Sequence, residues 1–469
     1  MKTLKSNKLK LNQVVFFNLL GPVILNGISF FTIPIFTRLL GTDNYGVYTL
    51  YSSYQSILVL IMGLQMQSVI APASIYYEGD ERERYLSASF SISLISCVLF
   101  SLIIVVLVKP ISNITKLPQA MVLLMVLQSV GMTSVQWALA RFTYEKKAKI
   151  NFILSTLIAL CGVLLSLLFI QVLLKSAKPY YGYVLGHTIP YAVLGITFFA
   201  CFLIKRKFFF AKREWTFCLA LCLPVVFHSL SNTLLHQADK IMIQSFMDDG
   251  VTGIYGFAVS FANVLSIIFN ALNVTWVPFY HDDIKENRTD RLKVKTNNYT
   301  FLFTCLTVGF IMAMPEVVKL FAQRDFWPSI KVIPILVIGT YFMFLYTFPV
   351  NFEFFYKKTK AVAFGTLLAC ICNIVLNYFL IQRLGMHGAA LATMISSALL
   401  YLFHLFIAKF RIKEEYHYPY KFFYVYLAIV IASAIIFYLI IDLFIIRWSI
   451  FVLAGILLLY RIIKNKSIF

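Results

Sequence analysis

The chain has 469 residues, of which 60% are hydrophobic and 13% are charged, and its mean hydropathy is +0.81. This composition excludes a soluble globular domain, because such domains carry about twice this share of charged residues. The formal net charge of +21 does not indicate nucleic-acid binding, since the basic residues are scattered through short polar segments. We therefore predict an all-α polytopic membrane protein.

Apolar runs of about 20 residues, the length that crosses a bilayer core, recur along the whole chain. Short polar connections separate them, so each run is predicted to be one transmembrane helix. The fourteen predicted spans are 14–37, 45–70, 85–108, 119–140, 150–174, 180–204, 215–246, 251–278, 298–321, 330–352, 361–382, 388–408, 421–441 and 447–463.

The first run follows a basic tail, Lys2 to Lys10, and so has the outline of a signal peptide. It is too long for one, and no small-residue cleavage site follows it, so it is predicted to be a transmembrane helix. Most of the 41 Lys and Arg residues then fall in every second connection. The positive-inside rule places these connections and both termini in the cytoplasm. The longest connection is expected at 279–297.

An internal repeat joins two segments of the chain. Residues 22–38, PVILNGISFFTIPIFTR, and residues 224–240, PVVFHSLSNTLLHQADK, both begin with Pro-Val and end with a cation. The match predicts two pseudo-symmetric six-helix copies with a cavity between them. The predicted domains are an N-terminal lobe (1–210), a C-terminal lobe (211–415) and an accessory pair of spans (416–469).

The span 215–246 carries a polar stripe. His228, Asn232 and His236 recur at intervals of four, followed by Asp239 and Lys240, which places them on one helix face. Two interpretations remain open. The stripe either bonds to neighbouring helices, with Asp239 and Lys240 forming a local pair, or it lines a hydrated cavity.

Three further spans carry polar residues at helical spacing. Asn263 and Asn270 lie on 251–278, Asn26 lies on 14–37, and Ser52 and Gln55 lie on 45–70. These spans are the repeat-related neighbours of 215–246. We therefore expect the four striped spans to line one cavity.

Arg38 ends the first apolar run, directly before the turn residues GTDN at 41–44. It is either an anchor that stretches to water or a charge that faces a pathway. Lys240 occupies the equivalent place in the second copy, which favours the pathway.

Other polar residues in the spans have simpler expected roles. Glu353 is expected to pair with the interfacial Lys357 or Lys358, with a coupling carboxylate as the alternative interpretation. Asn373 and Asn377 are expected to make interhelical hydrogen bonds.

Sequence motifs of catalysis and ATP binding, including G-x-x-x-x-G-K-[ST], G-x-S-x-G and H-E-x-x-H, do not occur. All eight cysteines fall within predicted spans, so we expect small core residues and neither disulfides nor metal ligands. The protein is therefore expected not to be an enzyme and to hold no cofactor and no metal.

The segments TRLLGTDNYGVY at 37–48 and LGMHGAALAT at 384–393 carry a family resemblance. Across about residues 10–410, the chain resembles the Wzx-type O-antigen and capsule repeat-unit flippases. These belong to the multidrug/oligosaccharidyl-lipid/polysaccharide exporter superfamily. The resemblance implies a two-lobed, V-shaped bundle in the bacterial cytoplasmic membrane, which flips undecaprenyl-diphosphate-linked oligosaccharides by alternating access.

The resemblance also implies roles for individual residues. Arg38 and Lys240 match the cationic cavity positions and would meet the diphosphate, while Arg141 would make the first contact with the headgroup. Amides and hydroxyls of the striped spans would meet the sugars, and Tyr48 and Trp276 would stack on them. The implied partners are the lipid-linked glycan, membrane lipids, a polysaccharide polymerase and glycosyltransferases, with no nucleic acid.

Several alternatives stay open. A lipid II flippase shares the implied fold, whereas a drug or cation antiporter of the multidrug and toxin extrusion type would be expected to hold acidic residues deep in the N-terminal lobe. A glycan polymerase is disfavoured by the short external connections. Asp239 would partly cancel the charge of Lys240. The glycan and the coupling ion, proton or sodium, are not determined by the sequence.

Overall fold

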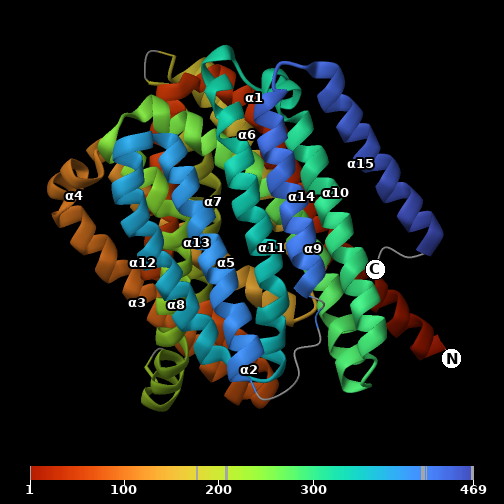
Figure 1. Cartoon of the computed structure of the whole chain (residues 1–469). Coiled ribbons are helices and arrows are strands. Elements are labelled where there is room, and N and C mark those ends of the chain that lie inside the picture. The colour runs from red at the N-terminus through yellow and green to blue at the C-terminus, as the bar shows by residue number, and fades with distance from the viewer. Residues whose placement is uncertain (1, 176–177, 206–209, 413–417, 419, 466–469) are drawn as a thin grey trace. The chain divides into compact units, whose positions relative to one another are not determined.

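The structure is a computed structural model that describes the backbone of residues 2–175, 178–205, 210–412, 418 and 420–465. Side chains are described from residue 24 on within those ranges, apart from those of residues 26, 205, 359, 420 and 465. The described residues form helices and turns and contain no strand (Figure 1).

The chain divides into two compact units, residues 1–234 (unit 1) and 235–469 (unit 2). The predicted lobe boundaries at 210 and 415 remain a prediction. The elements of unit 1 are α1 (Lys2–Gly63), η1 (Met66–Val69), α2 (Ile70–Tyr76), α3 (Gly79–Val106), α4 (Val108–Thr115), α5 (Gln119–Tyr144), α6 (Ala148–Leu168), η2 (Phe169–Leu173), α7 (Pro179–Lys205) and most of α8 (Lys212–Phe246). Unit 2 holds the end of α8, α9 (Asp249–Lys285), α10 (Thr289–Phe321), η3 (Arg324–Lys331), α11 (Ile333–Phe355), α12 (Thr359–Leu384), α13 (Met386–Phe406), η4 (Ile407–Arg411), α14 (Tyr420–Leu439) and α15 (Phe444–Asn465).

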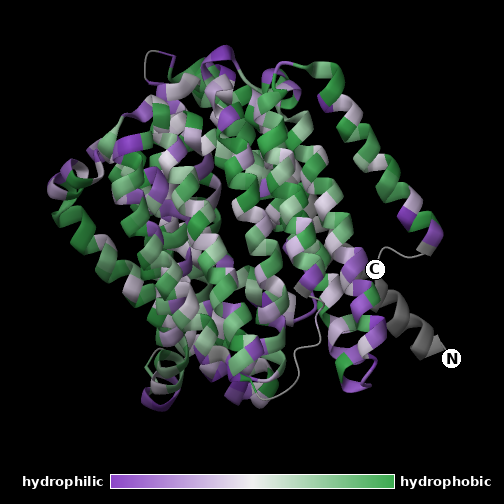
Figure 2. Ribbon diagram, viewed as in Figure 1, coloured by the Kyte–Doolittle hydropathy of each residue, from purple (hydrophilic) through white to green (hydrophobic). Residues whose placement is uncertain are grey.

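The predicted fold class is confirmed, because each predicted span from 85–108 onward coincides with a helix. Within the described residues, twelve helices are long and apolar enough to cross a membrane, and a bent pair, residues 27–63 with 66–76, raises the number to thirteen. Figure 2 shows hydrophobic residues along the helix shafts and hydrophilic ones at helix ends and connections. The prediction of about fourteen spans counts α1 as two.

A single glycine divides α1. Gly41 has φ 65° and ψ −179°, a backbone conformation that is not helical and that essentially only glycine adopts. The parts on either side, residues 2–40 and 42–63, correspond to the first two predicted spans. The expected turn at 41–44 is therefore one sharp break at Gly41.

Unit 1 is built around α5, α6 and α7, with α1 packed on all three. The helices α5 and α7 approach closely at Gly131 and Gly195. A Cβ added to Gly195 would lie 2.4 Å from the Gly131 Cα, so only glycine fits at this crossing. Close backbone approach of this kind is typical of helix packing in membranes.

Unit 2 packs α13 between α11 and α12, and α9 against α11. The last two helices, α14 and α15, both lie on α10 (Figure 1). Arg447 of α15 is buried there and makes two hydrogen bonds of 2.6 and 2.7 Å to the Glu316 carboxylate of α10. A charge-assisted, bidentate pair thus fastens α15 within unit 2.

The expected long connection at 279–297 is wrong. The helix α9 continues to Lys285 and α10 begins at Thr289, so only three residues connect them. The polar sequence reflects helices that extend beyond their apolar segments. Lys295 Nζ lies 2.5 Å from the buried Asp283 carboxylate and joins the two helix ends.

Candidate functional site

The polar stripe of α8 lies on a face that protein leaves largely uncovered. Asn232 and His236 are exposed and His228 is half-buried, whereas Leu235 and Asp239 on another face are buried. The stripe lies near the middle of the helix. On α6, by contrast, the residues exposed near the middle of the helix are apolar: Leu157, Leu160 and Leu164.

The helix α9 has the same division. Asn263 and Asn270, two turns apart, are exposed, while Phe261, Leu265 and Phe269 are buried on the opposite face. Rings of Phe261 and Phe269 contact Phe321 and Phe303 of α10, so this face belongs to the core of unit 2. The amide face is uncovered.

Asp239 and Lys240 do not form the local pair that one interpretation expected. The Asp239 carboxylate accepts a 2.6 Å hydrogen bond from Tyr255 OH of α9. Lys240 Nζ donates to Gln237 Oε1 at 2.8 Å and to the His236 carbonyl at 3.3 Å, and both acceptors are neutral. Among the described residues no ion pair involves Lys240, so its ammonium is buried without a carboxylate in contact.

Arg38 and Lys240 occupy equivalent places in the repeat but different environments. Arg38 is exposed and lies three residues before the break at Gly41. Lys240 is buried and lies six residues before α8 ends at Phe246. The repeat therefore predicts where the two cations lie along the chain but not how far they are exposed.

In the second part of α1, residues 42–63, most polar side chains are packed within unit 1. Gln55 is buried, and its Nε2 atom has no hydrogen-bond partner among the described residues, while Ser52 is half-buried and donates to the Thr49 carbonyl at 2.9 Å. The side chain of Asn26 lies outside the described residues. In unit 1, only Arg38 among the predicted cavity residues of α1 is clearly exposed.

The partner that holds α1 in unit 1 is Gln128, which the sequence analysis did not single out. Its Oε1 atom accepts hydrogen bonds from Tyr51 OH at 2.8 Å and Thr188 Oγ1 at 3.0 Å. One buried amide thus connects α1, α5 and α7. This polar group serves helix association, as the alternative interpretation of the stripes proposed.

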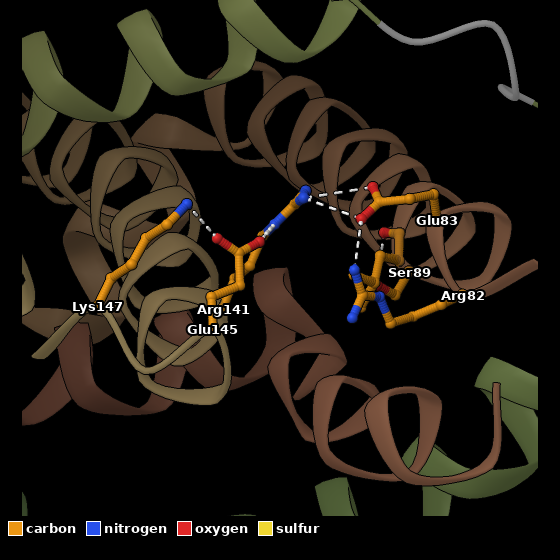
Figure 3. A network of polar contacts seen from close by, with 7 residues as sticks. Arg82, Glu83, Ser89, Arg141, Glu145 and Lys147 are labelled. Atoms are coloured by element: carbon orange, nitrogen blue, oxygen red, sulfur yellow. Dashed lines mark hydrogen bonds and ion pairs between the residues drawn. The ribbon is translucent and has the colours of Figure 1, made fainter. Parts of the chain in front are cut away.

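Arg141 lies in a network of ion pairs (Figure 3). Its guanidinium contacts Glu83 of α3 at 3.0 Å and Glu145 at 2.6 Å, and Lys147 contacts the other Glu145 oxygen at 2.6 Å. Arg82 completes the network 3.6 Å from Glu83. Two carboxylates engage the Arg141 guanidinium, so this residue joins α3 to the end of α5, and the network of three cations and two carboxylates keeps one net positive charge.

The network shifts the protonation of one carboxyl group. Burial raises the pKa of Glu145, but hydrogen bonds from Lys147 and Arg141 and the attraction of their charges lower it by more. The net pKa is below the ordinary value of 4.5. Glu145 therefore stays ionised in mildly acidic solution.

Two expectations for unit 2 are wrong. Glu353 is not paired with Lys357 or Lys358 at the interface; it is fully buried and lies 2.8 Å from His404 Nδ1 of α13. Trp276 is fully buried, with its ring 5.3 Å from that of Tyr299, and so does not face a cavity in this conformation. Hydropathy does not reveal that these two side chains are buried. A polar or aromatic residue near the end of a span has the same sequence pattern whether it is buried or lies at the membrane interface.

Asn373 and Asn377 also differ from expectation. Asn377 Nδ2 donates to Asn373 Oδ1 at 2.9 Å within α12, so this hydrogen bond joins one turn to the next rather than two helices. Both residues are buried. The spacing of four residues was a sufficient signal for this intrahelical bond.

Sequence signals existed for the two pairs between helices. Asp239 and Tyr255 lie seven and six residues from the α8–α9 connection, so an antiparallel hairpin brings them level. Glu353 and His404 each lie two residues before the end of their helix, and alternate spans run in the same direction. Distance from the helix end, rather than polarity, is the informative quantity.

Among the described residues, no group of three or more His, Cys, Asp or Glu side chains could hold a metal ion. All eight cysteines are free. Five of them are buried as expected, whereas Cys201 is exposed and Cys161 and Cys372 are half-buried.

The family model described as "Polysaccharide biosynthesis protein" matches residues 11–281, more than half of the chain. The chain belongs to this family. "Lsg locus putative protein 1" of Haemophilus influenzae is 21% identical over 369 residues, 76% of this chain and 88% of that protein. The "Succinoglycan biosynthesis transport protein ExoT" of Rhizobium meliloti is 24% identical over 310 residues, 64% of this chain and 60% of that protein.

Solved structures share the fold of this polysaccharide biosynthesis protein. The lipid II flippase MurJ in an inward closed conformation matches with a TM-score of 0.72 at 17% identity, over 96% of this chain and 99% of that one. An inward-facing multidrug resistance transporter of the MATE family and MOP superfamily matches with a TM-score of 0.64 at 14% identity, over 84% and 97% of the two chains. The resemblance to polysaccharide exporters of this superfamily is confirmed. The family is one of polysaccharide biosynthesis, and the fold is that of a multi-pass membrane protein.

Proposed function

We propose that the protein is a flippase that moves undecaprenyl-diphosphate-linked oligosaccharide repeat units across the bacterial cytoplasmic membrane by alternating access. The products would be O-antigen, capsule or exopolysaccharide. The family supports a role in polysaccharide biosynthesis. The polar faces of α8 and α9 support a transport route for a glycan, and this is the observation on which the proposal rests.

Exposed polar side chains near the middle of membrane-spanning helices need an explanation. Asn232, His236, Asn263 and Asn270 are all exposed. In hydrocarbon each would lack hydrogen-bond partners at a cost of several kcal/mol, by order of magnitude. A water-filled route removes this cost, and sugar hydroxyls can replace that water with equivalent hydrogen bonds. Amides and imidazoles that both donate and accept suit a ligand rich in hydroxyls.

The diphosphate would be bound by cations. Arg38 is exposed, and the Lys240 ammonium is bonded only to neutral oxygens, so its charge is not cancelled in contact by Asp239. A phosphate oxygen gains more from a cation than from a neutral donor, and more still in low dielectric. Lys240 is buried, so its role requires a conformation that opens α8. Arg141 is left out of the proposal because Glu83 and Glu145 already engage its guanidinium.

The proposed setting follows the positive-inside rule, with both termini in the cytoplasm. Glycosyltransferases would supply the lipid-linked glycan and a polymerase would consume it. We also propose that transport is coupled to the movement of protons or sodium ions, and we assign no residue to this coupling.

One alternative function is disfavoured by an observation within unit 1. The acidic residues there lie at helix ends or connections: Asp43, Glu78, Asp80, Glu81, Glu83, Glu145 and Glu214. A cation antiporter that binds its ion in the N-terminal lobe would be expected to hold a carboxylate deeper in a span. A lipid II flippase would use the same fold and stays the second candidate.

The test is export in cells. A strain that lacks the gene, complemented with Arg38→Ala, Asn232→Ala or Asn263→Ala, should display less surface polysaccharide while the protein stays in the membrane. Loss of one hydrogen bond to the glycan predicts a decrease of about twofold to tenfold for each amide. Asn113→Ala, which removes an exposed amide from α4, is the matched control and should export normally. Full export by all three variants would contradict the proposed site.

A further inference from the structure

A cavity of about 450 Å³ lies in unit 2 where the beginning of α10 meets the end of α15. Neither the polar stripes nor the repeat points to it. Its lining residues are Val294, Asn297, Asn298, Phe301, Leu457, Tyr460, Arg461 and Lys464.

Neutral partners hold Arg461 in this cavity. Its Nε donates to Asn298 Oδ1 at 3.1 Å, and its Nη1 donates to Tyr426 OH of α14 at 3.3 Å. Tyr426 OH in turn donates to Asn297 Oδ1 at 2.7 Å, and the guanidinium carbon lies 4.3 Å from the centre of the Phe301 ring. Three helices thus orient one guanidinium before any ligand binds, which reduces the entropy lost on binding.

The cavity is cationic and contains no counter-charge. Arg461 and Lys464 contribute two positive charges, and none of the lining residues is acidic. In the part of the chain that the structure describes, no ion pair involves either residue. The two contacts of Arg461 use two of its five N–H donors, which leaves donors for an anion.

The walls are apolar on the side of the spans. Leu457 is exposed and Phe301 is half-buried, and each lies about one turn further into its apolar span than the polar groups of the cavity. A ligand in this position would therefore meet two cations at the helix ends and hydrocarbon along the helix shafts. An anionic phospholipid has this combination, whereas a free phosphate gains nothing from the apolar wall.

We propose that this cavity binds the phosphate of an anionic phospholipid, with the headgroup between Arg461 and Lys464 and an acyl chain along Phe301 and Leu457. The beginnings of α10 and α14 meet the end of α15 here, and the sequence predicts that all three lie on the cytoplasmic side. Basic pockets between helices on that side bind such lipids. The bound lipid would stabilise the docking of α14 and α15 on α10. This site is independent of the glycan that the protein transports.

The test is lipid binding by the full-length protein, measured by native mass spectrometry with phosphatidylglycerol and phosphatidylcholine. Phosphatidylglycerol should bind more tightly, and Lys464→Gln should weaken it about fivefold. Arg461→Gln should weaken it further, with Arg461→Lys in between, because lysine keeps the charge but loses the planar fork. Lys360→Gln, an exposed cation at the start of α12, is the matched control and should bind as wild type.

Lys464→Gln decides the result if Arg461→Gln does not fold, since the Lys464 side chain donates no hydrogen bond to another helix among the described residues. Binding as tight as wild type by both Lys464→Gln and Arg461→Lys would overturn the proposal. Equal affinity for the two lipids would do the same. Displacement of phosphatidylglycerol by an excess of inorganic phosphate would identify a free-phosphate site instead of a lipid site.

Discussion

Glu353 and His404 face each other across α11 and α13, with 2.8 Å between a Glu353 carboxylate oxygen and His404 Nδ1. Both side chains are completely buried. The remaining polar atoms, Glu353 Oε2 and His404 Nε2, have no hydrogen-bond partner in the described residues. This pair therefore depends on its single internal contact for compensation of its burial.

Removing one member of this pair should be costly. Glu353→Ala leaves a buried imidazole without its partner, so we expect the protein to lose about 3 kcal/mol of stability. Glu353→Gln keeps an oxygen that can accept from the imidazole and should lose less. Heating of the purified protein in detergent, with the folded fraction followed by size-exclusion chromatography, measures both variants.

Lys358→Ala is the control for that experiment, because the sequence suggested that Lys357 or Lys358 pairs with Glu353. Both lysines are exposed. A loss of stability in Lys358→Ala equal to that in Glu353→Ala would contradict the buried pair and restore the interfacial one.

The ion-pair network at Arg141 predicts a pH dependence of stability. The folded-state pKa of Glu145 is lowered, so its contribution is fully present above the ordinary carboxyl pKa of 4.5 and is lost as the pH falls through the folded-state value. The stability difference between wild type and Glu145→Gln should thus be constant near neutral pH and shrink below about pH 4.5. Glu78→Gln, which changes an exposed carboxyl, serves as control. A difference that grows on acidification would have the wrong sign.

The break in α1 predicts a substitution effect that does not depend on contacts. In the part of the chain that the structure describes, no atom lies within 4 Å of a Cβ added to Gly41, so Gly41→Ala creates no clash there. Its cost comes from the backbone conformation, at about 1–3 kcal/mol. Gly27→Ala also meets no atom of the described side chains and backbone within 4 Å but lies in a regular helix, so it should be neutral or stabilising. Equal thermal stability of the two variants would argue against the positive φ at Gly41.

Thiol labelling tests whether the polar faces contact water. Asn232→Cys and Asn263→Cys, each made together with Cys201→Ser to remove the exposed native thiol, should react with a membrane-impermeant reagent, because reaction requires a hydrated thiolate. Leu164→Cys on α6 is the control. Its side chain is 64% exposed but lies on an apolar span and should not react. If the cysteines at positions 232 and 263 are both as unreactive as this control, the polar faces of α8 and α9 contact lipid or other helices and not water.

Sequence reasoning predicted the helices well because membrane spans carry a strong hydropathy signal. The span 119–140, for example, lies within α5 (Gln119–Tyr144). It failed at 279–297 because charge was taken as the sign of a loop, whereas α9 and α10 extend past their apolar segments and pair through Lys295 and Asp283.

The candidate site was harder to predict than the helices. A stripe of amides has the same sequence pattern whether it is uncovered, as at Asn263, or buried in helix contacts, as at Gln55. Only the packing of neighbouring helices around each face decides whether the stripe is exposed or buried. Gln128 lay on a span without an obvious stripe, so a single polar residue with two partners gave no periodic signal.

The most direct test of the proposed function is flipping in vesicles. Purified protein reconstituted into proteoliposomes should move an undecaprenyl-diphosphate-linked oligosaccharide to the opposite leaflet, measured as protection of the glycan from an external glycosidase. Arg38→Ala and Asn263→Ala should flip it more slowly, and Asn113→Ala should match wild type. If the wild-type protein flips lipid II but does not flip the oligosaccharide, the result would contradict the proposed substrate and identify the second candidate function instead.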